Sequence, residues 1–301
     1  MKSKSSKTAW IVFGIIVAVV IFVLIISSAL KQPITSNGLA LIRLDGPISL
    51  SSQESFFERA SPTRSIMQQL DEADKNQNVK AILLEINSPG GTVIASKELA
   101  NKVKSLEKPV IALIEEVGAS GAYWVASSAD KIVADSLSIT GSIGVTGSYL
   151  EFSNLFEKYG VTYQEVKGGK YKEIGSPFKD LTPEEQRVLQ NKINLIHERF
   201  LEEVANNRNL ETEQIAKIST GEFFLGEEAI NLGLVDILGG ENEAIETAKQ
   251  LTGLEELEIV DYTPQPTFFE SLFGLSSYYV GRGIGAELTS LRLENSLEII
   301  A

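Results

Sequence analysis

The chain has 301 residues, of which 43% are hydrophobic and 22% charged, and 40 acidic residues against 27 basic ones give it a net charge of −13. This length is ample for a buried core, and the acidic balance argues against nonspecific nucleic-acid binding. The absence of cysteine excludes disulfides, thiolate metal sites and cysteine nucleophiles, while a single histidine, His197, excludes multi-histidine metal sites.

The first thirty residues have the pattern of a membrane anchor. Residues 1–7 contain three lysines and no acid, and residues 8–30 contain no charge. As a helix, residues 8–30 would be ~34 Å long, which exceeds the ~30 Å of a hydrocarbon core. The positive-inside rule then leaves residues 1–7 in the cytoplasm and places the rest of this single-pass chain outside the cell membrane. The alternative is a cleaved signal peptide with small residues at 27–29, which would also export the body.

A short polar linker at 31–38 precedes alternating strand and helix patterns. Short, mostly apolar runs predict strands at Leu39–Leu44, Ala81–Ile86, Val110–Ile114 and Ile132–Ala134. Helices are predicted at Ser65–Asp74, with apolar residues on one face, and at Val93–Leu106. Alternation at this spacing is typical of βαβ units, so we expect an α/β domain with a mainly parallel sheet.

The second half of the chain is more helical. Residues 182–185 read Thr-Pro-Glu-Glu, which supplies an N-cap, a proline at the first helical position and a glutamate at the third. A core-facing stripe then follows at helical spacing: Leu189, Ile193, Ile196, Phe200 and Val204. A helix at Glu241–Leu251 and a strand at Leu257–Val260 complete a domain predicted to span residues 39–262. Residues 263–301 form a C-terminal tail, read as a flexible appendage or a partner-binding segment.

The turn around Ser120 is a candidate site for a nucleophile. Residues 118–123 read Gly-Ala-Ser-Gly-Ala-Tyr and join a predicted strand to a predicted helix. Small neighbours permit a sharp turn and a close approach by substrate, and the free N–H groups of a helix start suit a developing oxyanion. The plainer interpretation is a helix N-cap serine.

A second glycine-rich turn, at 87–92, also joins a strand to a helix. Successive glycines let backbone amides face a ligand. Two such turns at the ends of neighbouring parallel strands lie at the same edge of the sheet, where open α/β sheets bind ligands. The amides of Gly91 and Gly121 are therefore candidate oxyanion donors.

A serine nucleophile needs a base, and two residue types are available. His197 lies beside the apolar stripe of the long helix, where a packed structural role is the plainer interpretation. A lysine can accept a proton only when neutral, and therefore when desolvated. The residues alone do not separate Lys170 from Lys172 in the segment 168–178. Ser142, in a Gly/Ser turn, could orient the lysine amine.

Five motifs in order resemble the signal peptide peptidase A family in its short, single-domain form: Asn-Ser-Pro-Gly-Gly (87–91), Gly-Ala-Ser-Gly-Ala-Tyr-Trp (118–124), Thr-Gly-Ser-Ile-Gly-Val (140–145), Gly-Lys-Tyr-Lys-Glu-Ile-Gly-Ser-Pro-Phe (169–178) and Gly-Leu-Val-Asp (233–236). This resemblance implies that Ser120 is the nucleophile, Lys172 the general base and Ser142 the hydroxyl that holds the lysine amine. It also implies that the amides of Gly91 and Gly121 form the oxyanion hole. Glu173 departs from the family, which often has Ser or Thr beside the base.

The resemblance implies a Clp-protease/crotonase-like fold of repeated ββα units after one transmembrane helix. It also implies a membrane-anchored serine endopeptidase with a Ser-Lys dyad and no metal or cofactor, which degrades remnant signal peptides. Members of the family form rings in which neighbouring subunits help build each site, so we expect a homo-oligomer.

The sequence also permits other functions. A related membrane serine protease could cut one membrane-scaffold protein, and a catalytically silent, membrane-anchored assembly protein is a further alternative. A crotonase-type acyl-CoA enzyme could use Glu115 or Glu116, but export of the chain argues against it. An α/β-hydrolase is disfavoured because residues 118–122 do not read G-x-S-x-G.

Overall fold

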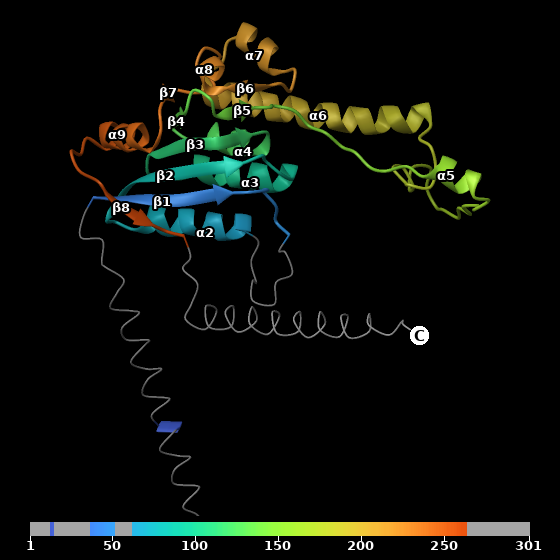
Figure 1. The fold of residues 1–301 in the computed structure, drawn as a ribbon, viewed down its shortest axis with the longest axis horizontal. Helices are drawn as coiled ribbons and strands as arrows, with labels where there is room; N and C mark the ends of the chain where they lie inside the picture. Colours follow the sequence, from blue (N-terminus) through green and yellow to red (C-terminus); the bar gives the residue numbers. More distant parts are fainter. Residues whose placement is uncertain (1–12, 15–36, 52–61, 264–301) are drawn as a thin grey trace, which may run out of the picture.

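The computed structural model describes residues 13–14, 37–51 and 62–263, drawn in colour in Figure 1. The predicted cytoplasmic segment 1–7 lies outside these residues. So, apart from a few positions, do the anchor at 8–30, the linker at 31–38 and the tail at 263–301. No helix in the described part of the chain has the length and hydropathy that crossing a membrane requires.

The body is built on one sheet with the order β6-β5-β3-β2-β1-β8, and β4 and β7 extend it from β3. The strands are β1 (Gly38–Asp45), β2 (Val79–Ser88), β3 (Val110–Ala119), β4 (Lys131–Ala134), β5 (Ile139–Gly141), β6 (Phe223–Leu225), β7 (Ile237–Leu238) and β8 (Glu258–Asp261). Every pairing is parallel except that of β5 with β6. The predicted α/β class and mainly parallel sheet are therefore confirmed.

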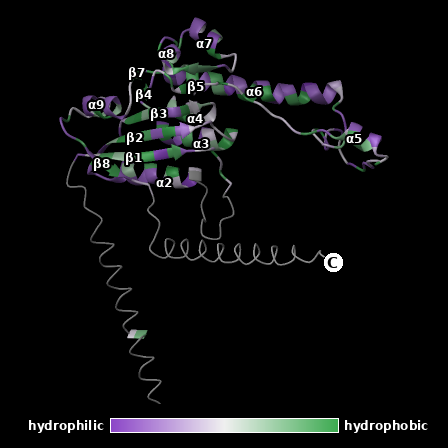
Figure 2. Ribbon diagram, viewed as in Figure 1, coloured by the Kyte–Doolittle hydropathy of each residue, from purple (hydrophilic) through white to green (hydrophobic). Residues whose placement is uncertain are grey.

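Helices cover both faces of this sheet. The helices are α2 (Pro62–Lys75), α3 (Val93–Lys104), α4 (Gly121–Ala126), α5 (Ser153–Lys158), α6 (Pro183–Arg208), α7 (Thr212–Ile218), α8 (Gly226–Ala229) and α9 (Glu241–Thr252). Alternate residues of β1 point to opposite faces, so Ile42 joins the core under α2, α3 and α4, whereas Leu41 packs in the core under α9. Figure 2 shows the hydrophobic residues concentrated on the central strands.

The long helix α6 begins as predicted, because Thr182 Oγ1 accepts from the Glu185 amide at 3.2 Å and the Glu185 carboxylate accepts from the Thr182 amide at 3.0 Å. Its predicted core stripe is only partly confirmed. Phe200 and Val204 are buried, whereas the stripe residues nearer the start of the helix are only half-buried. The reason is visible in Figure 1, where the first half of α6 projects beyond the sheet.

Residues 147–182, which we call the arm, lie with α5 beside this projecting end of α6 (Figure 1). The arm has its own small aromatic cluster, in which Phe178 stacks on Phe156 with ring centroids 5.6 Å apart and contacts Tyr163 at 5.2 Å. The Phe152 amide donates to the Pro177 carbonyl at 2.8 Å and ties the two ends of the arm together. The arm therefore packs on itself, away from the main core.

Candidate active site

Ser120 occupies a strained turn between β3 and α4. Its φ of 53° and ψ of −125° lie in a region that residues with a side chain rarely adopt, at a cost of about 1–3 kcal/mol. Two hydrogen bonds hold the turn, because the Ser120 amide donates to the Gly141 carbonyl at 2.8 Å and its carbonyl accepts from the Trp124 amide at 3.0 Å. The Ser120 side chain makes no capping hydrogen bond. The simple N-cap interpretation is therefore disfavoured, and the geometry is that of an elbow that presents a hydroxyl.

The second glycine turn packs directly against this elbow. A Cβ added to Gly90, whose φ is +95°, would lie 2.6 Å from the Gly121 nitrogen and 3.0 Å from Ser120 Cβ. A Cβ on Gly91 would lie 2.0 Å from the Ile48 carbonyl oxygen. Ser88 fixes the turn by donating to the Gly46 carbonyl at 2.6 Å. Only glycine therefore fits at positions 90 and 91. Because these residues have no side chains, room remains beside the elbow.

A cavity of about 110 Å³ opens at the elbow, and Gly91, Ser120 and Gly121 all line it. The structure therefore brings together the predicted nucleophile and both predicted oxyanion donors. One wall of the cavity is formed by Trp124 and Phe200, whose rings stack with centroids 4.4 Å apart. This stack also joins α4 to α6, so the wall of the cavity is part of the core.

Ser142 lies at the same edge of the sheet. Ala119 pairs with Gly141 across β3 and β5, so Ser142 follows directly after the residue whose carbonyl holds Ser120. Its φ of 51° is also in the left-handed region, and its amide donates to the Glu222 carbonyl at 2.9 Å. The backbone thus fixes Ser142 beside the elbow.

Lys172 is not brought to Ser120 within one chain. It is an exposed residue of the arm and lies two positions after Lys170. The Nζ atom of Lys170 lies 2.6 Å from the carboxylate of Glu184, at the start of α6. At ~1.5 Å per residue, Glu184 lies about 24 Å along the helix from Phe200, which lines the Ser120 cavity. Two residues of chain span at most ~7 Å. Figure 1 shows the arm at the projecting end of α6, away from the turn between β3 and α4, so the arm keeps Lys172 apart from the elbow of its own chain.

Glu173, which stands beside Lys172 where the family often has Ser or Thr, is half-buried in the arm. Its Oε1 accepts from the Tyr163 hydroxyl at 2.9 Å. This hydrogen bond to the carboxylate raises the pKa of Tyr163. One carboxylate oxygen of Glu173 is thus engaged by the arm itself.

His197 is tied to the backbone. Its Nε2 lies 3.0 Å from the Ile143 carbonyl oxygen, which can only accept, so Nε2 carries the proton. The contact joins α6 to the segment that follows β5. This supports a packing role for His197 over that of a general base.

The sequence reasoning missed residues that line the cavity, namely Ser96, Trp124 and Phe200. Trp124 and Phe200 were read only as motif and core residues. Ser96 lies on the buried face of α3, whose neighbouring buried residues are Ala95 and Leu99. A polar residue among apolar ones on a buried helix face was the signal that could have found it.

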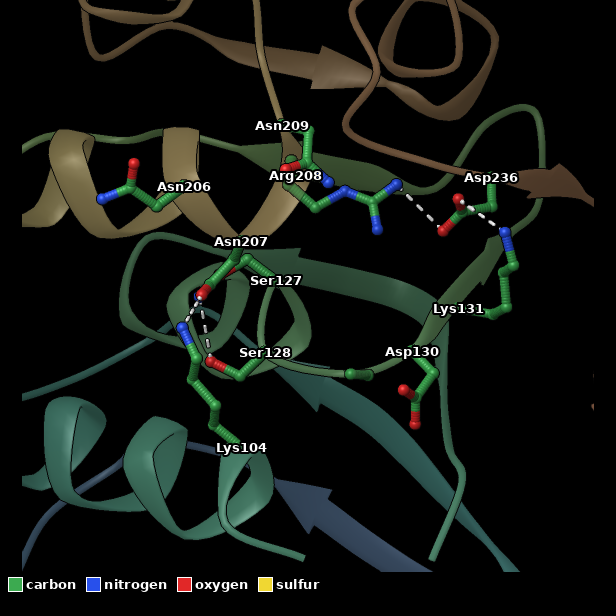
Figure 3. A pocket seen from close by; sticks show the side chains of 11 residues that line it. Lys104, Ser127, Ser128, Asp130, Lys131, Asn206, Asn207, Arg208, Asn209 and Asp236 are labelled. Atoms are coloured by element: carbon green, nitrogen blue, oxygen red, sulfur yellow. Dashed lines mark hydrogen bonds and ion pairs between the residues drawn. The ribbon is translucent and has the colours of Figure 1, made fainter. Parts of the chain in front are cut away.

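A larger cavity, of about 490 Å³, lies between the C-terminal end of α6 and the β4 region. Figure 3 shows the side chains that line it. Its charged groups bind one another: Arg208 lies 2.9 Å from Asp236, and Asp236 lies 3.5 Å from Lys131. Lys104 donates to Asn207 at 2.7 Å. These contacts fasten α6 to the body, and we assign them a structural role.

Two family models match the chain. Peptidase family S49 matches residues 102–255, and the Clp protease family matches residues 57–137. A protein of Methanocaldococcus jannaschii that is named as a protease is 43% identical over 76% of this chain and 74% of its own length. A protein of Enterococcus faecium named as a signal peptide peptidase is 31% identical over 92% of this chain and 80% of its own length. Protease 4 of Haemophilus influenzae is 37% identical over 71% of this chain and 35% of its own length. The chain therefore belongs to peptidase family S49 and is a serine-type peptidase with a Clp-protease-like α/β fold.

Proposed function

We propose that the chain is an endopeptidase with a Ser-Lys dyad, in which Ser120 is the nucleophile and Lys172 of a neighbouring copy is the general base. The observation that carries the proposal is the strained Ser120 elbow, which shares a cavity with the amide-bearing residues Gly91 and Gly121. Its Oγ is not used as a helix cap and is available to react.

The reaction follows from this arrangement. The neutral Lys172 amine takes the Ser120 proton while Oγ attacks the carbonyl carbon, and the Gly91 and Gly121 amides stabilise the oxyanion. Collapse of the tetrahedral intermediate breaks the C–N bond, and the Lys172 ammonium protonates the leaving amine. Water then gives a proton to the lysine and attacks the acyl ester. The ester C–O bond breaks, the Lys172 ammonium returns the proton to Ser120 Oγ, and the carboxylic acid product leaves. Ser142 holds the lysine amine beside the elbow.

The arm is the element that we expect to reach a neighbouring copy. It exposes large apolar side chains, among them Leu150 at 73%, Tyr159 at 71% and Val166 at 99% of their full accessibility. Exposed apolar groups gathered on one projecting segment mark an interaction surface. The half-buried start of the α6 stripe extends this surface. A homo-oligomeric ring would cover both and would supply each elbow with a lysine.

The proposed substrates are remnant signal peptides. Two features support this class: the N-terminal sequence predicts a single-pass anchor with an extracytoplasmic body, and a relative similar over 92% of the chain is named as a signal peptide peptidase. An enzyme tethered at the bilayer meets such peptides where they are released. External protease added to spheroplasts should digest the body and spare the N-terminal segment, and protection of the body would contradict the topology.

Labelling with a fluorophosphonate probe tests the dyad. The wild type should be labelled, Ser120→Ala should not, and Lys172→Ala should be labelled far more slowly. Labelling that survives Ser120→Ala would refute the nucleophile. An unchanged labelling rate in Lys172→Ala would exclude Lys172 as the general base and would favour His197.

A further inference from the structure

Ser96 is a buried hydroxyl without a partner. Its side chain is fully buried in α3, and its Oγ makes no hydrogen bond to any other described residue. Buried polar atoms in native proteins are nearly always hydrogen-bonded, so each exception needs an explanation. The explanation lies in its position, because Ser96 lines the same cavity as Ser120.

The Ser96 hydroxyl lies close to both Gly121 and Gly91. A Cβ added to Gly121 would lie 2.1 Å from Ser96 Oγ and 3.3 Å from the Gly91 nitrogen. These two distances place Ser96 Oγ at most about 5.4 Å from the Gly91 nitrogen. Two donors at that separation can both reach a single oxygen atom at ~2.9 Å. The upper bound therefore permits one oxygen atom to lie within hydrogen-bond distance of both the Gly91 amide and the Ser96 hydroxyl.

We infer that the Ser96 hydroxyl is a third hydrogen-bond donor to the substrate carbonyl oxygen, beside the amides of Gly91 and Gly121. The inference rests on the proposed function, since it needs a peptide carbonyl attacked by Ser120. The hydroxyl is desolvated and has no competing acceptor in the part of the chain that the structure describes. A carbonyl oxygen supplies the missing acceptor, and the bond strengthens as negative charge develops on that oxygen. Gly121 has no side chain because any side chain would fill this space.

Ser96→Ala tests the inference through activity and stability together. Loss of one oxyanion donor should lower kcat by on the order of 100-fold and leave KM nearly unchanged. The thermal midpoint should stay equal or rise, because the variant removes a buried hydroxyl that has no partner. Affinity for a peptide boronate, which forms a tetrahedral adduct with the serine, should fall by a similar factor. A purely structural role would not move boronate affinity and kcat in parallel.

Ser127→Ala is the matched control. Ser127 is equally buried, but its Oγ donates to the Trp124 carbonyl at 2.8 Å, and it does not line the Ser120 cavity. This variant should lose stability and keep its kcat. A wild-type kcat/KM in Ser96→Ala, or a lowered thermal midpoint, would overturn the inference. If Ser120→Ala is inactive at the same time, the proposed function stands without Ser96. If Ser120→Ala is active, the proposed function itself fails.

Discussion

Mixing two inactive variants tests whether each site is shared between chains. Ser120→Ala keeps the base and Lys172→Ala keeps the nucleophile, so neither should be active alone. The structure separates the two residues within one chain, because Glu184, which binds Lys170, lies about 24 Å along α6 from the cavity wall at Phe200. In a ring joined head to tail, a mixed oligomer would contain sites with Ser120 from one chain and Lys172 from the next.

The recovered activity can be calculated. In a random 1:1 oligomer, about a quarter of the interfaces join an intact Ser120 to an intact Lys172, so the mixture should regain about a quarter of wild-type activity. A dyad within one chain would regain none. The wild type mixed 1:1 with the double variant gives the complementary control: about half of full activity for a dyad within one chain and about a quarter for a shared dyad.

Co-expression with two affinity tags, followed by tandem purification, isolates oligomers that contain both chains. Peptide hydrolysis gives the activity, and a fluorophosphonate probe should label only the Lys172→Ala chain, which retains Ser120. The reasoning is refuted if oligomers proved to contain both chains stay inactive and unlabelled. A wild type that remains monomeric at micromolar concentration and still cleaves peptide would refute it equally.

The remaining predictions concern the arm and the glycine turn. Thr182 and Lys179 hydrogen-bond to the Glu185 carboxylate and lower its pKa from 4.5 to about 2, so this attachment should weaken as pH falls from about 4.5 to about 2. Amide hydrogen exchange in the arm should therefore become faster over that pH window in the wild type, and this change should be absent in Glu185→Gln. Identical exchange profiles of the wild type and the variant would contradict the prediction. Gly90→Ala should abolish activity because its Cβ would crowd the Gly121 nitrogen at 2.6 Å. Gly253 also has a positive φ but has open space around it, so Gly253→Ala should lower stability and leave activity unchanged. Equal activity in the Gly90→Ala and Gly253→Ala variants would contradict the reasoning.

The central sheet was predictable because buried parallel strands are continuous apolar runs. The run at 81–86 became the middle of β2, and the run at 110–114 became the first half of β3. The short strands β5, β6 and β7 were not found, since two or three residues carry no period. Helix α6 shows a further limit. The spacing of its apolar residues identified an apolar face correctly. The spacing does not show what covers that face, and within one chain only the end at Phe200 and Val204 is buried.

The candidate site divides in the same way. The elbow could be predicted because Gly and Ala around Ser120 are what a sharp strand-to-helix turn requires. The separation of Lys172 from Ser120 could not, because it depends on where the arm leaves the body. The sequence shows Ser96 as a polar residue on an apolar helix face, but only the structure shows that its hydroxyl has no partner among the described residues.

The contact between Gly121 and Ser96 links local backbone chemistry to the site. Gly121 begins α4, where alanine would be the better helix former, yet a methyl group there would lie 2.1 Å from Ser96 Oγ and 2.8 Å from Ser96 Cβ. Gly121→Ala should therefore destabilise the fold by about 1–3 kcal/mol. In the Gly121→Ala background, Ser96→Ala should relieve only part of this destabilisation, because the collision with Ser96 Cβ remains. Ser96→Gly should relieve more of it, but the gain is reduced by the ~1 kcal/mol that glycine costs inside a helix. Denaturant unfolding of the single and double variants measures this coupling. Additive losses would mean that the two residues do not touch, and would remove the geometric basis for placing the Ser96 hydroxyl beside the oxyanion donors.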